Sequence, residues 1–312
     1  MKFNKIILMD FNDETIDKDH FDVLNQLAES VEIVCDRNLD KIKDADVLLT
    51  KITTKVDKEL IDSCKNLKYI GVFATSFSKI DIEYAESKGI VVTNLAGYST
   101  EAVAEFVFSV LLDYIRDLER GKENARKNDF EFLSFLGWEL KGKTIGIIGL
   151  GSIGRRVSEI AQGFGLNVIY WSRNRKLDYE SKGIEYYELE DVLKKSDIII
   201  IHLAHNNETN KIINKDMLEK IKNGAVLITL TSLELMDTEK LKELLKQGRF
   251  VLISDYLDLF QEEERKELQK LKNVVAFPPL AFRTKEAIQR QKNLLIDNLV
   301  KFSEGKIQNK VN

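Results

Sequence analysis

A glycine-rich turn near the middle of the chain constrains the fold more than any other feature of this sequence. The apolar run at 144–148 is typical of a buried parallel strand, and it leads directly into Gly149-Leu-Gly151-Ser-Ile-Gly154. Gly149 permits a tight turn, Gly151 lets a phosphate approach the backbone, and Gly154 allows the next helix to pack closely on the strand. The pattern therefore predicts a strand, a phosphate-binding turn and a helix, in that order.

The residues around this turn supply the context that a dinucleotide site needs. A helical pattern runs from 152 to 164, and a second apolar strand at 167–171 completes a βαβ unit. The helix begins with Ser152 and Ile153. Its N-terminus is therefore expected to present backbone N–H groups and the positive end of the helix dipole to a pyrophosphate. A glycine turn without a ligand would require none of this context, and we therefore interpret the segment as a dinucleotide-binding site.

Length and charge narrow the class of protein. The chain has 312 residues, enough for two domains, and its 44% apolar and 31% charged residues are typical of a soluble globular protein. The net charge of −4 does not favour a nucleic acid as partner. No apolar run approaches the ~20 residues of a membrane span, so we expect no membrane partner and a cytoplasmic protein.

Cysteine and histidine are scarce. Cys35 and Cys64 are expected to be buried free thiols, because neither belongs to a metal-binding pattern, and no metal site is expected. His20, His202 and His205 are the only histidines. Few side chains are therefore available for acid–base chemistry near neutral pH.

Alternating strand and helix patterns predict two α/β domains with parallel sheets. In the first hundred residues, helices are expected at 18–30, 58–64 and 82–88, and strands at 5–9, 31–35, 46–49, 69–72 and 91–94. Further along, strands are expected at 144–148, 168–171, 197–202, 225–229, 250–254 and 274–277. The second set matches the strand number of a dinucleotide-binding sheet.

Two long helical patterns flank the second set of strands. The pattern at 99–125 is apolar around much of its circumference, which is typical of a helix buried between domains or between subunits. The pattern at 284–302 is expected to return to the first domain. We therefore predict a flavodoxin-like domain of residues 1–98 and 285–312, and an inserted Rossmann-like domain of residues 99–284.

Several segments in order along the chain resemble the D-isomer-specific 2-hydroxyacid dehydrogenases, and among them the branch of glycerate and glyoxylate reductases. These segments are 67–75, 89–94, 98–105, 140–154, 207–209, 222–228, 277–278 and 284–287. The resemblance implies a substrate domain split by a cofactor domain, a cleft between the two, and a homodimer formed through the helix at 99–125. It also implies hydride exchange between a nicotinamide and a small 2-oxo or 2-hydroxy acid.

The three residues with which this family performs its reaction are absent from their expected positions. The family's arginine, which pairs with the substrate carboxylate, is replaced by Ser232, and its proton-donating histidine by Pro279. The position of the glutamate that orients the histidine is Phe260, although Glu262 and Glu263 are close enough for a shifted loop to bring one of them in. The catalytic residues are therefore unknown from the sequence.

The substrate loop that the resemblance implies also departs from the family. Where the family has a glycine-rich turn that holds the substrate carboxylate with backbone N–H groups, this chain has Thr75, Ser76 and Phe77. The side chains of Ser76 and Phe77 would crowd or reshape such an anion site. The clustered departures indicate either a site that has lost its function or one specialised for a different ligand.

Two other residues are candidate replacements. His205 follows the strand at 197–202 and is a candidate acid or base, although an exposed loop histidine is the simpler interpretation. Arg283 follows the position of the lost histidine and is a candidate cation, although a surface ion pair explains it equally well.

The cofactor-binding residues are expected at the carboxyl ends of the strands. His202, Thr229 and Asp255 end three of them. The acidic residue that binds the ribose of NAD is replaced by Ser172, and Arg173 and Arg175 follow it. Without a carboxylate to repel a 2′-phosphate, and with two arginines to bind one, NADP(H) is favoured over NAD(H).

Two functions fit these observations. The first is an NAD(P)(H)-dependent oxidoreductase that acts on a carbonyl or CH–OH substrate through a non-standard catalytic site. The alternative is a catalytically silent NAD(P)-binding sensor or scaffold. The glycine turn fits both, whereas the shortage of acid–base residues favours the second.

Overall fold

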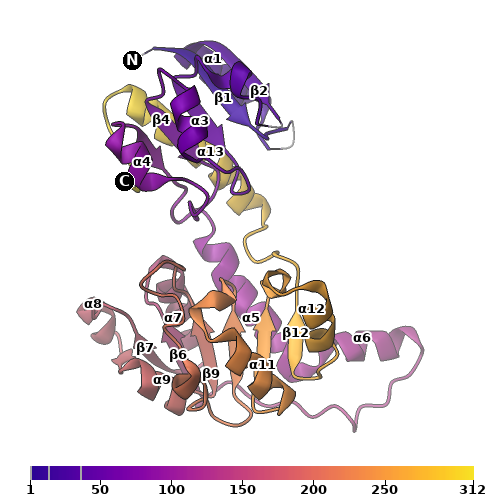
Figure 1. Cartoon of the computed structure of the whole chain (residues 1–312). Helices are drawn as coiled ribbons and strands as arrows, with labels where there is room; N and C mark the ends of the chain where they lie inside the picture. Colours follow the sequence, from indigo (N-terminus) through magenta and orange to yellow (C-terminus); the bar gives the residue numbers. More distant parts are fainter. Residues whose placement is uncertain (1, 13–14, 36) are drawn as a thin grey trace. The chain divides into compact units, whose positions relative to one another are not determined.

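The computed structural model describes residues 2–12, 15–35 and 37–312. The chain divides into two compact units, one of residues 1–99 with 284–312 and the other of residues 100–283 (Figure 1). Each unit contains one parallel sheet with helices around it, so the predicted α/β class is confirmed. Among the described residues, no helix is long and apolar enough to cross a membrane.

The first unit is built on a five-stranded sheet with the strand order β2-β1-β3-β4-β5. The strands are β1 Phe3–Met9, β2 Ala28–Val34, β3 Val47–Thr50, β4 Tyr69–Val72 and β5 Val91–Thr93. The helices are α1 Lys18–Leu27, α2 Leu39–Ile42, α3 Lys58–Ser63, α4 Ile82–Ser87 and α13 Lys285–Ser303. The C-terminal helix α13 packs against α1 and β4, where Phe302 contacts the rings of Phe3 and Tyr69. The end of the chain is therefore part of the core of this unit.

Two expectations for this unit need correction. The helix expected at 18–30 ends at Leu27, because the backbone from Ala28 onward is extended and pairs with β1 along its whole length. The β-branched residues that follow favour such a strand over a helix. Cys35 is exposed and only Cys64 is buried.

The second unit is built on a seven-stranded parallel sheet with the order β12-β11-β10-β9-β6-β7-β8. The strands are β6 Thr144–Ile148, β7 Asn167–Trp171, β8 Glu185–Tyr186, β9 Ile198–Ile201, β10 Val226–Thr229, β11 Val251–Ser254 and β12 Val274–Ala276. The α-helices are α5 Thr100–Arg116, α6 Leu118–Arg126, α7 Ser152–Gly163, α8 Leu177–Glu180, α9 Leu189–Lys195, α10 Lys215–Leu218, α11 Thr238–Lys246 and α12 Glu262–Gln269, and the 3-10 helices are η1 Leu233–Leu235 and η2 Leu257–Leu259. The short, polar strand β8 was not expected because two residues carry no alternating pattern.

The order of strands in this sheet determines where a ligand binds. The chain moves from β6 outward through β7 and β8, and then returns to the other side of β6 to place β9. Ligands of open α/β sheets bind at such a reversal, beyond the carboxyl ends of the strands. Both faces are covered: Ile198 and Ile200 of β9 point into one apolar core, and Ile199 and Ile201 point into the other.

The long helix expected at 99–125 is interrupted. It forms α5 and α6, separated by Asp117, whose φ of 50° is in the left-handed region and cannot continue an α-helix. The apolar side chains of α5 pack within the second unit, largely against α7. In contrast, α6 buries no residue, and the segment after it exposes Phe130, Phe132, Leu133 and Leu136.

We predict that Gly154→Ala destabilises the second unit. A Cβ added there would lie 2.2 Å from the carbonyl oxygen of Gly149, and such overpacking typically costs about 1–3 kcal/mol of unfolding free energy. Gly163→Ala on the same helix is the matched control, because a Cβ there meets nothing within 4 Å. Alanine is the better helix former, so the control should gain up to about 1 kcal/mol. Urea unfolding measures both variants, and equal stabilities would contradict the close packing at Gly154.

Candidate functional site

A cavity of ≈ 550 Å³ opens at the carboxyl ends of β6, β7 and β9, at the reversal in strand order. It is formed by the glycine turn, the loop after β7 and the loop after β9. The residues that line it are Gly149, Leu150, Gly151, Ser152, Arg155, Ser172, Arg173, Asn174, Lys176, His202, Leu203, Ala204, Asn206 and Thr209. Of the predicted residues, Gly149, Gly151, Ser152, Ser172, Arg173 and His202 thus lie around one space, whereas Ile153 and Gly154 do not line it.

The glycine turn forms the floor of this cavity. Gly149 has a φ of 102°, and a Cβ on it would lie 2.7 Å from the carbonyl oxygen of His202, so only glycine fits. A Cβ on Gly151 would meet no atom within 4 Å, which leaves the backbone there open to a ligand. Helix α7 starts at Ser152, and its unpaired backbone N–H groups lie at this end. These features fit the pyrophosphate of a dinucleotide.

Arg155 is a cavity residue that the sequence analysis missed. Its guanidinium lies 4.8 Å from the centre of the Tyr179 ring, and its buried Nε atom has no hydrogen-bond partner. A buried unpaired donor is costly unless a ligand satisfies it, so its position beside the glycine turn fits an anionic group. Its place in the sequence, directly after the last glycine of the motif, was the available signal.

The two arginines after Ser172 have different surroundings. Arg173 lines the cavity, and its Nη2 lies 2.5 Å from Oε2 of Glu208, on the loop after β9. Arg175 does not line the cavity, because its Nε donates a hydrogen bond of 3.0 Å to Glu180. From the same loop, Lys176 rather than Arg175 lines the cavity together with Arg173.

His202 directly follows β9 and lines the cavity as a neutral ring. Burial lowers its pKa from the ordinary 6.5 to about 4, because the charged imidazolium would lose its hydration. Its Nε2 atom is buried and has no hydrogen-bond partner. A neutral, unpaired ring fits a hydrogen bond to a ligand, whereas it is a poor source of protons at neutral pH.

Asp255, directly after β11, is an unusual buried carboxyl group. The backbone N–H of Ala281 donates to it, but its Oδ1 atom has no partner. Burial raises the pKa of this carboxyl to about 6 because the charged form is poorly solvated there. Thr229 ends the neighbouring strand β10 and is also buried, with its Oγ1 3.4 Å from the carbonyl oxygen of Thr231. Neither Thr229 nor Asp255 lines the cavity described above.

The residues at the family's three catalytic positions differ in their surroundings: one caps a helix, one is in the apolar core and one is exposed. Ser232 caps the 3-10 helix η1, and its Oγ accepts a hydrogen bond of 3.3 Å from the N–H of Glu234. Phe260 is buried in the apolar core, and Pro279 is exposed. None of these three side chains carries an ionisable group.

The nearby candidate acids and cation stand apart from the histidines. Glu262, in the first turn of α12, pairs with Lys266 on the same helix at 2.5 Å, and Glu263 is exposed. Arg283 is also exposed, and its backbone N–H donates to Leu280. The structure thus pairs neither glutamate with a histidine.

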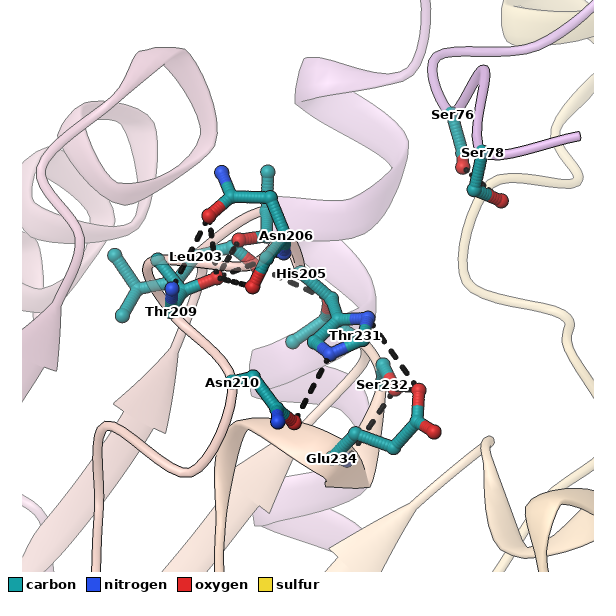
Figure 2. A network of polar contacts seen from close by, with 11 residues as sticks. Ser76, Ser78, Leu203, His205, Asn206, Thr209, Asn210, Thr231, Ser232 and Glu234 are labelled. Atoms are coloured by element: carbon teal, nitrogen blue, oxygen red, sulfur yellow. Dashed lines mark hydrogen bonds and ion pairs between the residues drawn. The ribbon is translucent and has the colours of Figure 1, made fainter. Parts of the chain in front are cut away.

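His205 is instead paired with a glutamate that the sequence analysis missed. Its Nδ1 lies 3.3 Å from Oε2 of Glu234, and its Nε2 lies 3.4 Å from Oδ1 of Asn210 (Figure 2). The Oγ of Ser232 lies 3.2 Å from the same Oε2 atom. Sequence spacing gave no signal for this pair, because the histidine and the glutamate are 29 positions apart. Two loops at the carboxyl edge of one sheet bring them together.

The expected substrate loop lies in the first unit. Two hydrogen bonds join it to the segment that follows β5: the Thr75 hydroxyl donates to the carbonyl oxygen of Leu95 at 3.2 Å, and the Asn94 amide donates to the Thr75 carbonyl at 2.7 Å. Ser76 hydrogen-bonds to Ser78 at 3.4 Å (Figure 2), and Phe77 packs against the apolar core.

Fold and cavity together define a dinucleotide-binding α/β protein. Residues 108–281, more than half of the chain, match the NAD-binding domain of the D-isomer-specific 2-hydroxyacid dehydrogenases. The chain belongs to this family, and the predicted resemblance is confirmed. A nicotinamide cofactor and an oxidoreductase scaffold follow from this membership.

Individual relatives support the same assignment. The glyoxylate reductase of Thermococcus litoralis is 39% identical over 277 residues, which are 86% of this chain and 84% of the relative. The structure of Aquifex aeolicus D-lactate dehydrogenase with NAD and lactic acid is 27% identical, covers 96% of both chains and superposes with a TM-score of 0.86. An acyclic imino acid reductase in complex with NADPH and D-Arg is 29% identical, with a TM-score of 0.88 over 99% of this chain and 100% of that one.

We predict that Asp255→Asn stabilises the protein at pH 7.5 and has little effect near pH 4. The raised native pKa of Asp255 means that, between about pH 4 and 6, the unfolded chain releases a proton that the native state retains. Stability is therefore lost as the pH rises through this window. Two units of pKa correspond to about 3 kcal/mol, and asparagine removes this penalty. Urea unfolding of both proteins at the two pH values measures it, and a difference independent of pH would contradict the raised pKa.

Proposed function

We propose that this protein is an NADP(H)-dependent reductase that converts the carbonyl group of a small 2-oxo acid or related compound to a hydroxyl group. The observation that carries the proposal is the cavity at the glycine turn, where the open backbone and the unpaired Nε atom of Arg155 fit a dinucleotide. Relatives that are glyoxylate reductases favour this activity over a silent sensor or scaffold.

The residues of the cavity divide the binding work. The N-terminus of α7 and Arg155 would hold the pyrophosphate. The neutral ring of His202 would form one hydrogen bond with the cofactor, as donor or as acceptor. A reduced nicotinamide, when bound, supplies a hydride to the substrate carbon. The protein must then supply a proton to the substrate oxygen, and His205 and Arg283 are the proposed sources of the proton and of positive charge.

The preference for NADP(H) rests on the loop after β7. Ser172 occupies the place of the acidic residue that would repel a 2′-phosphate, and its hydroxyl is held by the carbonyl oxygen of Asn174 at 2.6 Å. Arg173 and Lys176 bring two positive charges to the cavity wall. A guanidinium forms charge-assisted hydrogen bonds with a phosphate, which the 2′-hydroxyl of NADH cannot match.

We predict that Arg173→Ala weakens NADPH binding about tenfold or more and leaves NADH binding nearly unchanged, because one charge-assisted contact is worth roughly 1.5–3 kcal/mol. Lys195→Ala is the matched control, since it removes a positive charge from a side chain that packs on Tyr187 and does not line the cavity. Fluorescence titration with both cofactors measures the affinities. Equal losses for the two cofactors would argue against a 2′-phosphate site at Arg173.

Reduction of a C=N bond is the second candidate function. Pro279 stands at the family's proton-donor position and cannot transfer a proton. A protonated imine carries its own proton and its own positive charge, so hydride addition to it requires neither an acid nor a polarising cation. The similar imino acid reductase supports this candidate.

We predict that the purified protein oxidises NADPH in the presence of glyoxylate or hydroxypyruvate. Absorbance at the nicotinamide band measures turnover, and the same assay with ammonium or methylamine added tests reduction of the imine that forms. Faster oxidation only with amine would favour the second candidate. Tight NADPH binding without turnover on any of these compounds would instead support a sensor or scaffold.

A further inference from the structure

His205 lies between two oxygen atoms from different loops. The Oε2 atom of Glu234 faces its Nδ1 at 3.3 Å, and the Oδ1 atom of Asn210 faces its Nε2 at 3.4 Å (Figure 2). Its side chain is 32% exposed, so the ring is held by contacts and remains accessible. This combination of restraint and access is required of a group that exchanges protons with a substrate.

The two partners of the ring are not equivalent. A carboxylate has no hydrogen to donate, so Glu234 can only accept and fixes the hydrogen of the neutral ring on Nδ1. The amide of Asn210 presents an oxygen in the observed orientation and an NH₂ group after a flip, so it can pair with Nε2 whether or not that nitrogen carries a hydrogen. Nε2 is therefore the atom that can gain and lose a proton while the ring stays in place.

A set of hydrogen bonds holds the partners of His205. The Oγ atom of Ser232 makes two contacts with Glu234. It accepts a hydrogen bond of 3.3 Å from the backbone N–H and donates one of 3.2 Å to Oε2. The Thr231 hydroxyl donates to the carbonyl oxygen of Leu203 at 3.1 Å and so joins the loop after β10 to the loop after β9. These bonds reduce the motion that the pair would otherwise have at the surface.

The loop after β9 is itself closed by a second group of bonds. The Thr209 hydroxyl donates to the carbonyl oxygen of Ala204 at 2.7 Å and accepts from the N–H of Asn206 at 2.9 Å. Ala204 and Asn206, the neighbours of His205 on both sides, line the cofactor cavity. The histidine is thus fixed at the edge of that cavity, on the same loop as His202.

We propose that His205 is the proton donor of this reductase and that Glu234 is its positioning residue, a pair that replaces the family's histidine and glutamate. The inference rests on the proposed function. When the hydride of a reduced nicotinamide adds to the substrate carbon, the C=O π bond breaks and its electron pair moves to oxygen. The oxygen takes the proton from Nε2, and solvent returns a proton to the ring.

The first test needs neither cofactor nor substrate. Ring ¹⁵N chemical shifts report which nitrogen of a neutral imidazole carries the hydrogen, and the chain has only three histidines to assign. For the neutral ring of His205 in the wild type we expect the Nδ1–H form. In Glu234→Gln we expect a mixture, because an amide can also donate. An unchanged Nδ1–H preference in the variant would overturn the role of Glu234.

The second test is turnover of carbonyl substrates by His205→Ala. Loss of a general acid typically lowers kcat by 10²–10⁴-fold, and we expect added imidazole to restore part of it. NADPH affinity should stay unchanged, because the His205 side chain does not line the cavity. The matched control is His20→Ala on α1, whose Nε2 contacts Asn293 in the first unit, and it should retain full activity.

The outcomes separate this inference from the function on which it rests. A wild-type protein that reduces no carbonyl compound contradicts the proposed function. A wild type that is active, with His205→Ala equally active, leaves the function standing and overturns the proton donor. Selective loss of carbonyl reduction, with reduction of preformed imines retained, supports the assignment, since imines bring their own proton.

Discussion

The close approach of α7 to β6 at Gly154 is the contact on which the cofactor site of this protein depends. A side chain at that position would collide with the carbonyl oxygen of Gly149, so the helix would have to move away from the strand. Its N-terminus would then no longer point at the space above the turn. Arg155, the next residue, would move with it and leave the cavity wall. Because Gly154 has no Cβ, the helix can pack at the distance that places its N-terminus, the open backbone of the turn and the Arg155 guanidinium around the same cavity.

The sequence predicted well those parts of the molecule whose cause is local. The glycine turn and both parallel sheets follow from residue types at short spacing. The helix at 99–125 was predicted as continuous because its pattern does not show that Asp117 adopts a left-handed conformation. Strand β8 was missed because two residues contain no periodicity.

Contacts between loops could not be predicted in the same way. Glu208 beside Arg173 and Glu234 beside His205 join segments that the sheet brings together from distant parts of the chain. The sequence does show that Ser232 is no arginine and Pro279 no histidine. It does not show that Ser232 caps the helix carrying Glu234, since capping depends on the backbone of the folded loop. The loss of the family's residues and the candidate replacement His205 were therefore visible in the sequence, whereas the contact of His205 with Glu234 required the structure.

The substituted positions have a physical logic of their own. A serine at the arginine position holds the end of η1, and a phenylalanine at the glutamate position fills the apolar core near α12. Both residues stabilise the fold at positions where the family has charged residues that take part in the reaction. On the proposed assignments, His205 supplies the proton and Arg283 the positive charge near the reacting oxygen. The serine at position 232 cannot form the two parallel hydrogen bonds with which a guanidinium holds a carboxylate. The acid group of a substrate would therefore have to be held by a group other than the residue at this position.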